Sequence, residues 1–330
     1  WREDPSNLDD HFERVRVRFG VEPPLPLVVD ATQSLRHLGR AGQASGLSVS
    51  LDRSVLGSPT RAPEVLVHET THTLADYVSG WRLASEGRST KVFNEGFAMT
   101  LEHDLVGEAP GATDDLVLAT LHHRGLLRAE LFVDYEAVER AHDPNLAYPL
   151  GETFVRAMMD AYGEDAPVRV LRAFGRRERG WHLEGEALWR EVMLDAGMSY
   201  DLVVGRAFAR LDAMTSRMEP EVRSVPALRA VVSVTRDTVI VRVERERYDA
   251  GAAGTVELSS GVRVVCRFRD PTETSVDRYF VTYEPCSMPR RHFAGPSVQV
   301  QLGAVVPHGE HGSDERADVV YDPWVDVRTE

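Results

Sequence analysis

The sequence of 330 residues predicts an α+β protein in which a mostly helical part precedes an all-β part. Two observations carry this prediction. Apolar residues recur with helical spacing through most of segment 61–217, whereas from about Val222 onward they alternate with period two. A third observation is that segment 1–60 contains two strand-like runs. We therefore expect a small α/β lobe over 1–60, a helical lobe over 61–217 and a β-sandwich over 218–330.

The α/β lobe is predicted from two short runs. Residues 25–31, LPLVVDA, are mostly apolar and predict a buried strand. Residues 46–52, GLSVSLD, alternate apolar residues with serine, which predicts a half-buried strand with one polar face. A strand of this kind can lie at the edge of a sheet.

The helical lobe is expected to contain seven helices. The first begins near Pro63, a residue suited to the first helical turn, and ends near Gly80. The second begins at about Ser89 and ends at Gly107. The other five are predicted at DDLVLATLHHR, GETFVRAMMDAYG, APVRVLRAFG, EGEALWREVMLDAG and YDLVVGRAFARLDAMTS.

The all-β part shows about seven short runs with alternating apolar residues, separated by Gly and Pro. This number of short strands is typical of an immunoglobulin-like β-sandwich. Segment 216–226, SRMEPEVRSVP, is the expected boundary between the helical lobe and the sandwich. The seven runs are LRAVVSV, TVIVRVE, GTVELSS, VRVVCRF, RYFVTYE, SVQVQL and ADVVY.

Composition limits the classes of partner. Hydrophobic residues make up 42% and charged residues 27% of the chain, as in an ordinary globular protein. The formal net charge of −14 argues against a nucleic-acid partner, because phosphate binding needs a basic surface. No apolar run approaches the roughly eighteen residues of a membrane span.

The chain start and the cysteines bear on localisation. The chain begins at Trp1 without a methionine, as expected if an upstream segment has been removed. Cys266 and Cys286 allow one disulfide, and two buried thiols are the alternative. Both features favour a secreted or cell-envelope protein, with a cytoplasmic protein as the alternative.

Segment 67–73, VHETTHT, contains an HExxH motif with two histidines one helical turn apart. At this spacing His68 and His72 project from one face of a helix, so both imidazoles can bind one Zn²⁺. Glu69 is rotated by about 100° around the helix and can reach a water bound to that ion, as a general base does. The alternative is a pair of partly exposed histidines without a metal.

A third ligand is indicated 23 residues after His72, in the segment FNEGFAMTLE. HETTH followed by NEGFA resembles the gluzincin metallopeptidases, in particular those related to the M1 aminopeptidases. The two segments together cover about 35 residues, and the connection between them is a few residues longer than is usual in those enzymes. The resemblance implies a zincin-like metallopeptidase domain over 1–217, with one Zn²⁺ held by His68, His72 and Glu95.

A further segment, AYPLGETFVRAMMDAYG, resembles the Tyr-x-x-Gly segment of the same enzymes, whose tyrosine donates a hydrogen bond to the oxyanion. This implies the same role for Tyr148, and a capping or core tyrosine beside Pro149 is the alternative. The M1 aminopeptidases also carry a Gly-x-Met-Glu-Asn segment that binds the free amino terminus of the substrate. No counterpart precedes residue 61, so aminopeptidase activity is not implied.

Two more carboxylates lie near the predicted ligands. Glu102 is seven residues after Glu95, about 10 Å along the helix axis, so it is too far to bind the ion and is expected behind a ligand or in solvent. Asp76, one turn after His72, is a candidate acceptor for the outer nitrogen of that imidazole, and a carboxylate on the helix surface is the alternative.

We therefore expect a zinc-dependent metallopeptidase, a hydrolase that cleaves peptide or protein substrates as an endopeptidase. Glu69 would act as general base on a zinc-bound water, and Tyr148 would stabilise the oxyanion. An extended substrate would add to the strand at 46–52 by main-chain hydrogen bonds. One alternative is a hydrolase of cell-wall or glycopeptide substrates on the same frame. Another is a catalytically inactive binding or adhesion protein that uses its β-sandwich.

Overall fold

The computed structural model shows a mixed α+β protein with many helices and three small sheets among its described residues. This confirms the α+β class. None of the described helices is both long and apolar enough to cross a membrane. The structure describes residues 8–22, 28–32, 35, 41–85, 87–107, 112–177, 183–235, 237–246, 264–271, 280–283, 286–293, 297–305 and 319–328.

The chain divides into two compact units. The first comprises segments 1–110, 128–135 and 147–211. The second comprises segments 111–127, 136–146 and 212–330. Three segments that the sequence analysis assigned to the helical lobe, 111–127, 136–146 and 212–217, thus group with the strands of the second unit.

The first unit contains a three-stranded sheet with the order β1-β3-β2. β1 (Val28–Thr32) runs parallel to β3 (Ser48–Asp52), and β2 (Gly42–Ser45) runs antiparallel to β3. A two-residue turn joins β2 to β3, and its first residue, Gly46, has φ of +59°, a conformation that glycine adopts without strain.

The prediction that residues 46–52 form an edge strand is wrong. β3 lies in the middle of the sheet, and β2, which the sequence analysis did not predict, is an edge strand. β3 is central because it pairs with β1 on one side and with β2 on the other. β2 escaped prediction because its sequence, GQAS, holds no residue with high strand propensity.

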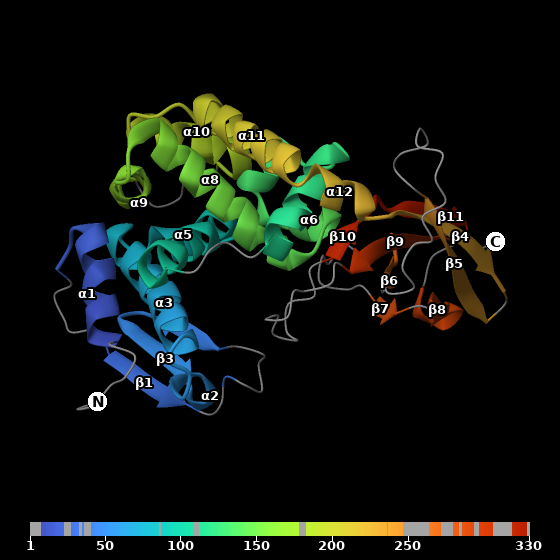
Figure 1. Ribbon diagram of the computed structural model, residues 1–330, viewed down its shortest axis with the longest axis horizontal. Helices are drawn as coiled ribbons and strands as arrows, with labels where there is room; N and C mark the ends of the chain where they lie inside the picture. Colours follow the sequence, from blue (N-terminus) through green and yellow to red (C-terminus); the bar gives the residue numbers. More distant parts are fainter. Residues whose placement is uncertain are drawn as a thin grey trace. The chain divides into compact units, whose positions relative to one another are not determined.

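The helix that contains the HExxH segment packs on this sheet. α3 (Arg61–Val78) lies between the sheet and α5 (Arg88–Val106), as Figure 1 shows. Leu66 of α3 is buried in one cluster with Val49 and Leu51 of the sheet. The sheet therefore covers one side of α3 and leaves the opposite side to α5.

All seven predicted helices are present within a few residues of their expected ends, six of them in the first unit or beginning there. α1, α2, α4 and the 3₁₀ helix η2 were not predicted. The remaining helices that lie or begin in the first unit are α1 (Leu8–Phe19), α2 (Arg53–Leu56), α4 (Arg82–Ser85), η2 (Ala129–Phe132), α8 (Ala147–Tyr162), α9 (Ala166–Arg176), α10 (Gly185–Asp195) and α11 (Tyr200–Arg217).

Two glycines allow α5 and α8 to approach closely. A Cβ added to Gly96 of α5 would lie 1.9 Å from the carbonyl carbon of Gly151 of α8. A Cβ added to Gly151 would lie 1.9 Å from the main-chain oxygen of Val92. Neither position has room for a side chain, so this glycine pair sets the separation of the two helices.

We expect Gly96→Ala to destabilise the protein because the obstacle is helix backbone, which cannot rotate away. Overpacking of this kind typically costs about 1–3 kcal/mol. Thermal unfolding followed by circular dichroism should show a midpoint lowered by roughly 2–12 °C. The control is Gly205→Ala in α11, where an added Cβ meets nothing within 4 Å and should stabilise the helix by up to about 1 kcal/mol. Equal midpoints for Gly96→Ala and wild type would refute the close crossing.

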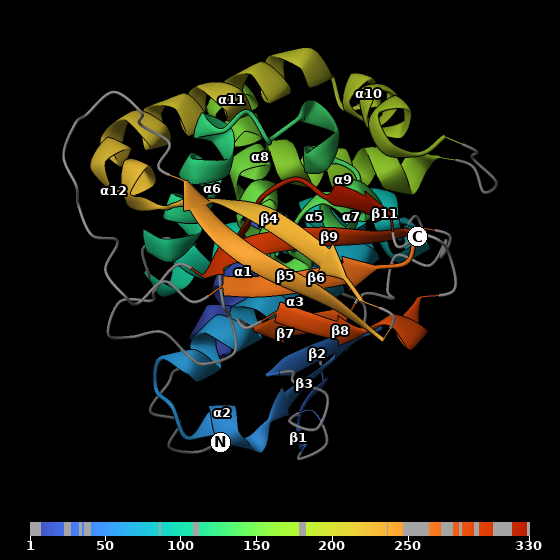
Figure 2. The same ribbon diagram turned by 90° about the vertical axis from the view of Figure 1, so that its right-hand side faces the viewer.

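The second unit contains two sheets. One has the order β10-β9-β6-β7, with β11 also pairing with β9, and the other has the order β4-β5-β8. Figure 2 shows β4 and β5 in front of β9 and β6. The strands of the second unit are β4 (Ala227–Val234), β5 (Thr238–Glu246), β6 (Val264–Arg269), β7 (Phe280–Tyr283), β8 (Cys286–Pro289), β9 (Ser297–Val305), β10 (Val319–Tyr321) and β11 (Val325–Arg328).

Six of the seven predicted runs correspond to these strands. The seventh, GTVELSS, lies outside the described residues, and β8 and β11 were not predicted. The segment expected as a boundary includes a short helix. The other helical elements of the chain are α6 (Ala112–His123), α7 (Tyr135–Ala141), η3 (Pro144–Leu146), α12 (Glu219–Ser224) and η4 (Arg290–His292).

A disulfide joins the two sheets of the second unit. It links Cys266 of β6 to Cys286 of β8, whose Cα atoms are 6.0 Å apart. Of the two alternatives left by the sequence, the disulfide is therefore the one present. Closing a loop of 20 residues stabilises the fold by about 3 kcal/mol in the chain-entropy model.

A buried arginine attaches segment 136–146 to the strands. Arg267 of β6 is 1% exposed and donates a hydrogen bond of 2.7 Å to the main-chain oxygen of His142. Its guanidinium also lies over the ring of Tyr321, 4.8 Å from the ring centroid. The hydrogen bond to His142 explains why segment 136–146 belongs to the second unit. Helical periodicity alone could not have indicated this grouping.

Candidate metal centre

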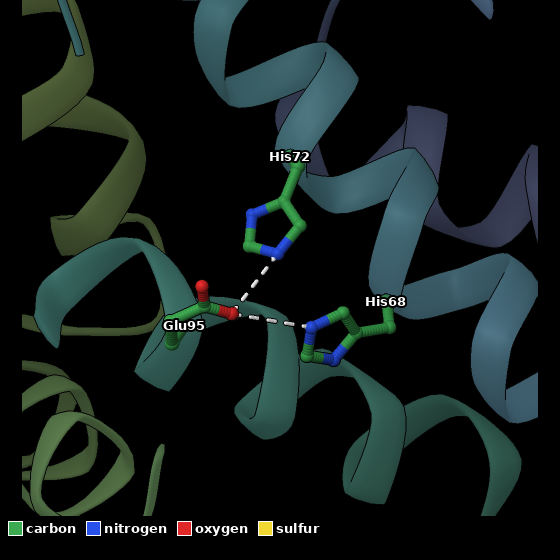
Figure 3. A group of neighbouring side chains, drawn as sticks. All are labelled: His68, His72 and Glu95. Carbon is green, nitrogen blue, oxygen red and sulfur yellow. Dashed lines mark ion pairs between the residues drawn. The ribbon is translucent and has the colours of Figure 1, made fainter. Parts of the chain in front are cut away.

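Three side chains from α3 and α5 converge in the first unit (Figure 3). The Nε2 atoms of His68 and His72 lie 3.4 Å and 3.2 Å from Oε2 of Glu95. The three side chains are only 12%, 14% and 14% exposed, so the group is mostly buried yet open to solvent. The structure thus brings together all three predicted ligands, two from one helix and one from another.

The spacing of these atoms fits a metal ion. Their ligand atoms all lie within 4.8 Å of one another. In a tetrahedral zinc site with nitrogen and oxygen ligands at about 2.0–2.2 Å, neighbouring ligand atoms are about 3.3 Å apart. The two nitrogen–oxygen separations agree with that value. The group His68, His72 and Glu95 can therefore hold a metal ion.

A fourth side chain orients one ligand. Nδ1 of His68 lies 3.1 Å from Oε2 of Glu102, two turns after Glu95 on α5. This hydrogen bond leaves Nε2 directed at the candidate site, as outer carboxylates do for metal-binding histidines. Of the two positions expected for Glu102, the one behind a ligand is confirmed.

Of the two positions expected for Asp76, the one behind His72 is not observed. Nδ1 of His72 is buried, and no hydrogen-bond partner for it occurs among the described residues. Asp76 therefore does not accept a hydrogen bond from this imidazole. The two histidines differ, because His68 is held from behind by a carboxylate, whereas no described residue is hydrogen-bonded to the outer nitrogen of His72.

The protonation of the group follows from burial and charge. Burial lowers the pKa of His68, but hydrogen bonds with Glu102 and Glu95 outweigh it and raise that pKa to about 10. Burial raises the pKa of Glu95, but the neighbouring His72 and His68 outweigh it and lower that pKa. Without a metal the carboxylate is ionised and carries protonated imidazole beside it. A bound cation would replace those protons, as metals do at histidine sites.

Glu69 lies where α3 meets the edge strand. A Cβ added to Gly42 of β2 would lie 2.7 Å from Cγ and 3.0 Å from Oε1 of Glu69. A side chain on β2 at this position would therefore force the side chain of Glu69 or Val65 to move. The sequence analysis missed both β2 and Gly42, although the dipeptide Ser45–Gly46 is a turn signal that could have indicated the hairpin.

Tyr148 lies beside the same group. It is in the first turn of α8, and its ring is 6.0 Å from the ring of His68, centroid to centroid, at an angle of 29°. The close crossing of α5 and α8 at Gly151, three residues later, holds it there. The structure thus brings the five predicted site residues into one region of the first unit.

Other histidines are engaged elsewhere. His103 pairs with Glu152 at 2.8 Å, and His122 pairs with Asp212 at 2.7 Å. Among the described residues, His68, His72 and Glu95 form the one group of this kind that could hold a metal ion. Comparison of the chain with protein-family models and with curated proteins finds no match.

Proposed function

We propose that this protein is a zinc-dependent metallopeptidase. The observation that carries the proposal is the convergence of two histidine Nε2 atoms and the Glu95 carboxylate, from two helices, at separations suited to tetrahedral zinc. We also propose that the first unit has a zincin-like fold and that the two sheets of the second unit form an immunoglobulin-like sandwich. The HExxH and NEGFA segments support the first, and the disulfide between the sheets supports the second.

The residues around the site have distinct roles in peptide hydrolysis. Zn²⁺ held by His68, His72 and Glu95 would polarise the scissile carbonyl and lower the pKa of a water molecule. Glu69 would accept a proton from that water and pass it to the leaving amine. Glu69 is suited to this because it follows His68 directly on α3 and is not one of the three ligands.

The edge strand offers a place for the substrate. Among the described residues β2 pairs on one side only, with β3. An extended peptide can add to such an edge through main-chain hydrogen bonds, and at Gly42 it would pass directly beside Glu69. This mode of binding accepts the middle of a chain, and for this reason we propose an endopeptidase.

We expect Tyr148→Phe to lower kcat by about 10²–10³-fold with KM little changed. The hydroxyl would donate a hydrogen bond only when charge develops on the carbonyl oxygen, so its loss affects the transition state more than substrate binding. Steady-state kinetics on a peptide substrate measures this. The control is Tyr162→Phe at the other end of α8, whose hydroxyl accepts a hydrogen bond from the main-chain nitrogen of Ser199. A Tyr148→Phe variant as fast as the control would assign Tyr148 to packing against His68.

The proposed function is tested directly on the purified protein. We expect elemental analysis to find about one zinc per chain and casein to be cleaved. A chelator should abolish cleavage, and added Zn²⁺ should restore it. Cleavage of cell-wall peptides or glycopeptides in place of casein would favour the alternative substrate class. A zinc-loaded protein that cleaves none of these would fit the inactive binding protein and overturn the proposal.

The disulfide also bears on where the enzyme acts. Structural disulfides persist mainly in oxidising compartments, outside the cytoplasm. The bond between Cys266 and Cys286 therefore supports the proposal of a secreted or cell-envelope enzyme.

A further inference from the structure

Lys91 lies one helical turn before the Glu95 ligand on α5. It is the only lysine in a chain that has 52 acidic residues and a formal net charge of −14. Residues four apart lie on the same face of a helix, so Lys91 and Glu95 face the same side of α5. Their Cα atoms are about 6 Å apart along the axis, roughly the length of two residues of an extended peptide.

The environment of this lysine is aromatic. Its Nζ lies 3.7 Å from the ring centroid of Tyr135, and that tyrosine is 8% exposed. Lys91 itself is half-buried. Among the described residues no ion pair joins its ammonium to a carboxylate, whereas Arg156 of α8 is paired with Glu152 and Asp104.

A half-buried ammonium over an aromatic ring lacks part of its hydration. The cation–π contact contributes about 0.5–2 kcal/mol, but it leaves the N–H donors of the ammonium without an anion. A carboxylate from outside the chain would supply both the charge and the acceptors. Such a group binds most strongly where water is partly excluded.

We propose that Lys91 and Tyr135 form a subsite that binds a carboxylate of the peptide substrate. The carboxylate is either an acidic side chain near the scissile bond or the C-terminal carboxylate of the substrate. The subsite rests on the proposed peptidase function, since Lys91 lies one turn from the ligand Glu95 on the same face of α5. It makes Lys91 a residue that determines specificity.

The test compares peptides that differ only by Glu or Gln, with the exchange placed in turn at each of two positions on either side of the scissile bond. Each peptide is made with a free C-terminal carboxylate and as the amide. We expect wild type to prefer one carboxylate-bearing peptide by roughly 10- to 100-fold in kcat/KM, the usual strength of a charge-assisted hydrogen bond. A preference for Glu over Gln would identify a side chain as the source of the carboxylate. A preference for the free acid over the amide would identify the C-terminus. The preference should shrink with added salt.

Lys91→Met removes the charge and keeps the apolar stem, so the preference ratio should fall to about one. Lys91→Arg should retain a preference. The control is Arg88→Met, an exposed cation one turn earlier on α5, which should leave the ratio unchanged. Because each ratio is taken within one variant, partial loss of folded protein does not alter it. A Lys91→Met ratio equal to that of wild type, or no preference in wild type, would overturn the subsite.

Binding separates this proposal from the peptidase proposal. The same peptides are titrated by fluorescence anisotropy against Glu69→Gln, with and without Lys91→Met. Tighter binding of the carboxylate peptide that disappears with Lys91→Met supports the subsite even if wild type cleaves nothing. In that case the peptidase proposal fails alone. Cleavage without any dependence on Lys91 would reject the subsite alone.

Discussion

A Glu69→Gln variant is expected to keep its zinc and to lose turnover by about 10²–10⁴-fold, the usual contribution of a general base. Glutamine has nearly the shape of glutamate, so it fits the space beside Gly42 and leaves the three ligands in place. It cannot accept the proton of the attacking water. Elemental analysis and steady-state kinetics on one peptide measure the two quantities on the same preparation.

The matched control for this change is Glu64→Gln. Glu64 lies in the first turn of the same helix, so the control makes the same chemical change away from the candidate site. It should keep both zinc and activity. A Glu69→Gln variant that turns over at the wild-type rate would remove Glu69 from the mechanism. Loss of zinc in that variant would instead make Glu69 a ligand.

The His72→Ala variant is expected to lose its zinc. It leaves two ligands where tetrahedral zinc needs three from the protein and one open position. The loss of affinity should exceed the 10–100-fold that removal of an outer hydrogen-bond partner typically costs. Glu102→Ala should show that smaller loss of zinc affinity, because it removes only the acceptor behind His68. Competition against a chromophoric chelator would rank wild type, Glu102→Ala and His72→Ala in that order.

A histidine outside the group controls for general effects of the substitution. His122 pairs with Asp212 in the second unit, and His122→Ala should bind zinc as wild type does. Retention of the full zinc content by His72→Ala would show that the metal is held elsewhere. Equal zinc affinities for Glu102→Ala and wild type would show that the hydrogen bond to His68 does not tune the site.

Much of the candidate site was predictable because it depends on helix geometry. The spacing of His68 and His72 places both imidazoles on one face of α3 whatever surrounds that helix. The NEGFA segment indicated Glu95 through its resemblance to a known ligand segment, and the structure brings its carboxylate to both histidines. The spacing of apolar residues that predicts helices and strands also depends only on neighbouring residues. Most predicted elements are present for that reason.

Other features depend on contacts between segments far apart in the chain. Gly96 and Gly151 are 55 residues apart, and only their contact shows why neither can carry a side chain. The weak strand β2 is stabilised by pairing with β3, so its own sequence gave no strand signal. Lys91 has an ordinary sequence context, and only the structure shows that its ammonium lies over the ring of Tyr135.

By itself, the sequence determined the α+β class, the positions of most helices and strands, and the residue types of a candidate metal site. These follow from periodicity and side-chain chemistry, which act within a few residues of each other. Only the tertiary structure decided the strand order β1-β3-β2, the hydrogen bond that Glu102 accepts from His68 and the pairing of Cys266 with Cys286. The physical reason is that each of these depends on packing between segments distant in the chain, which local propensity does not encode.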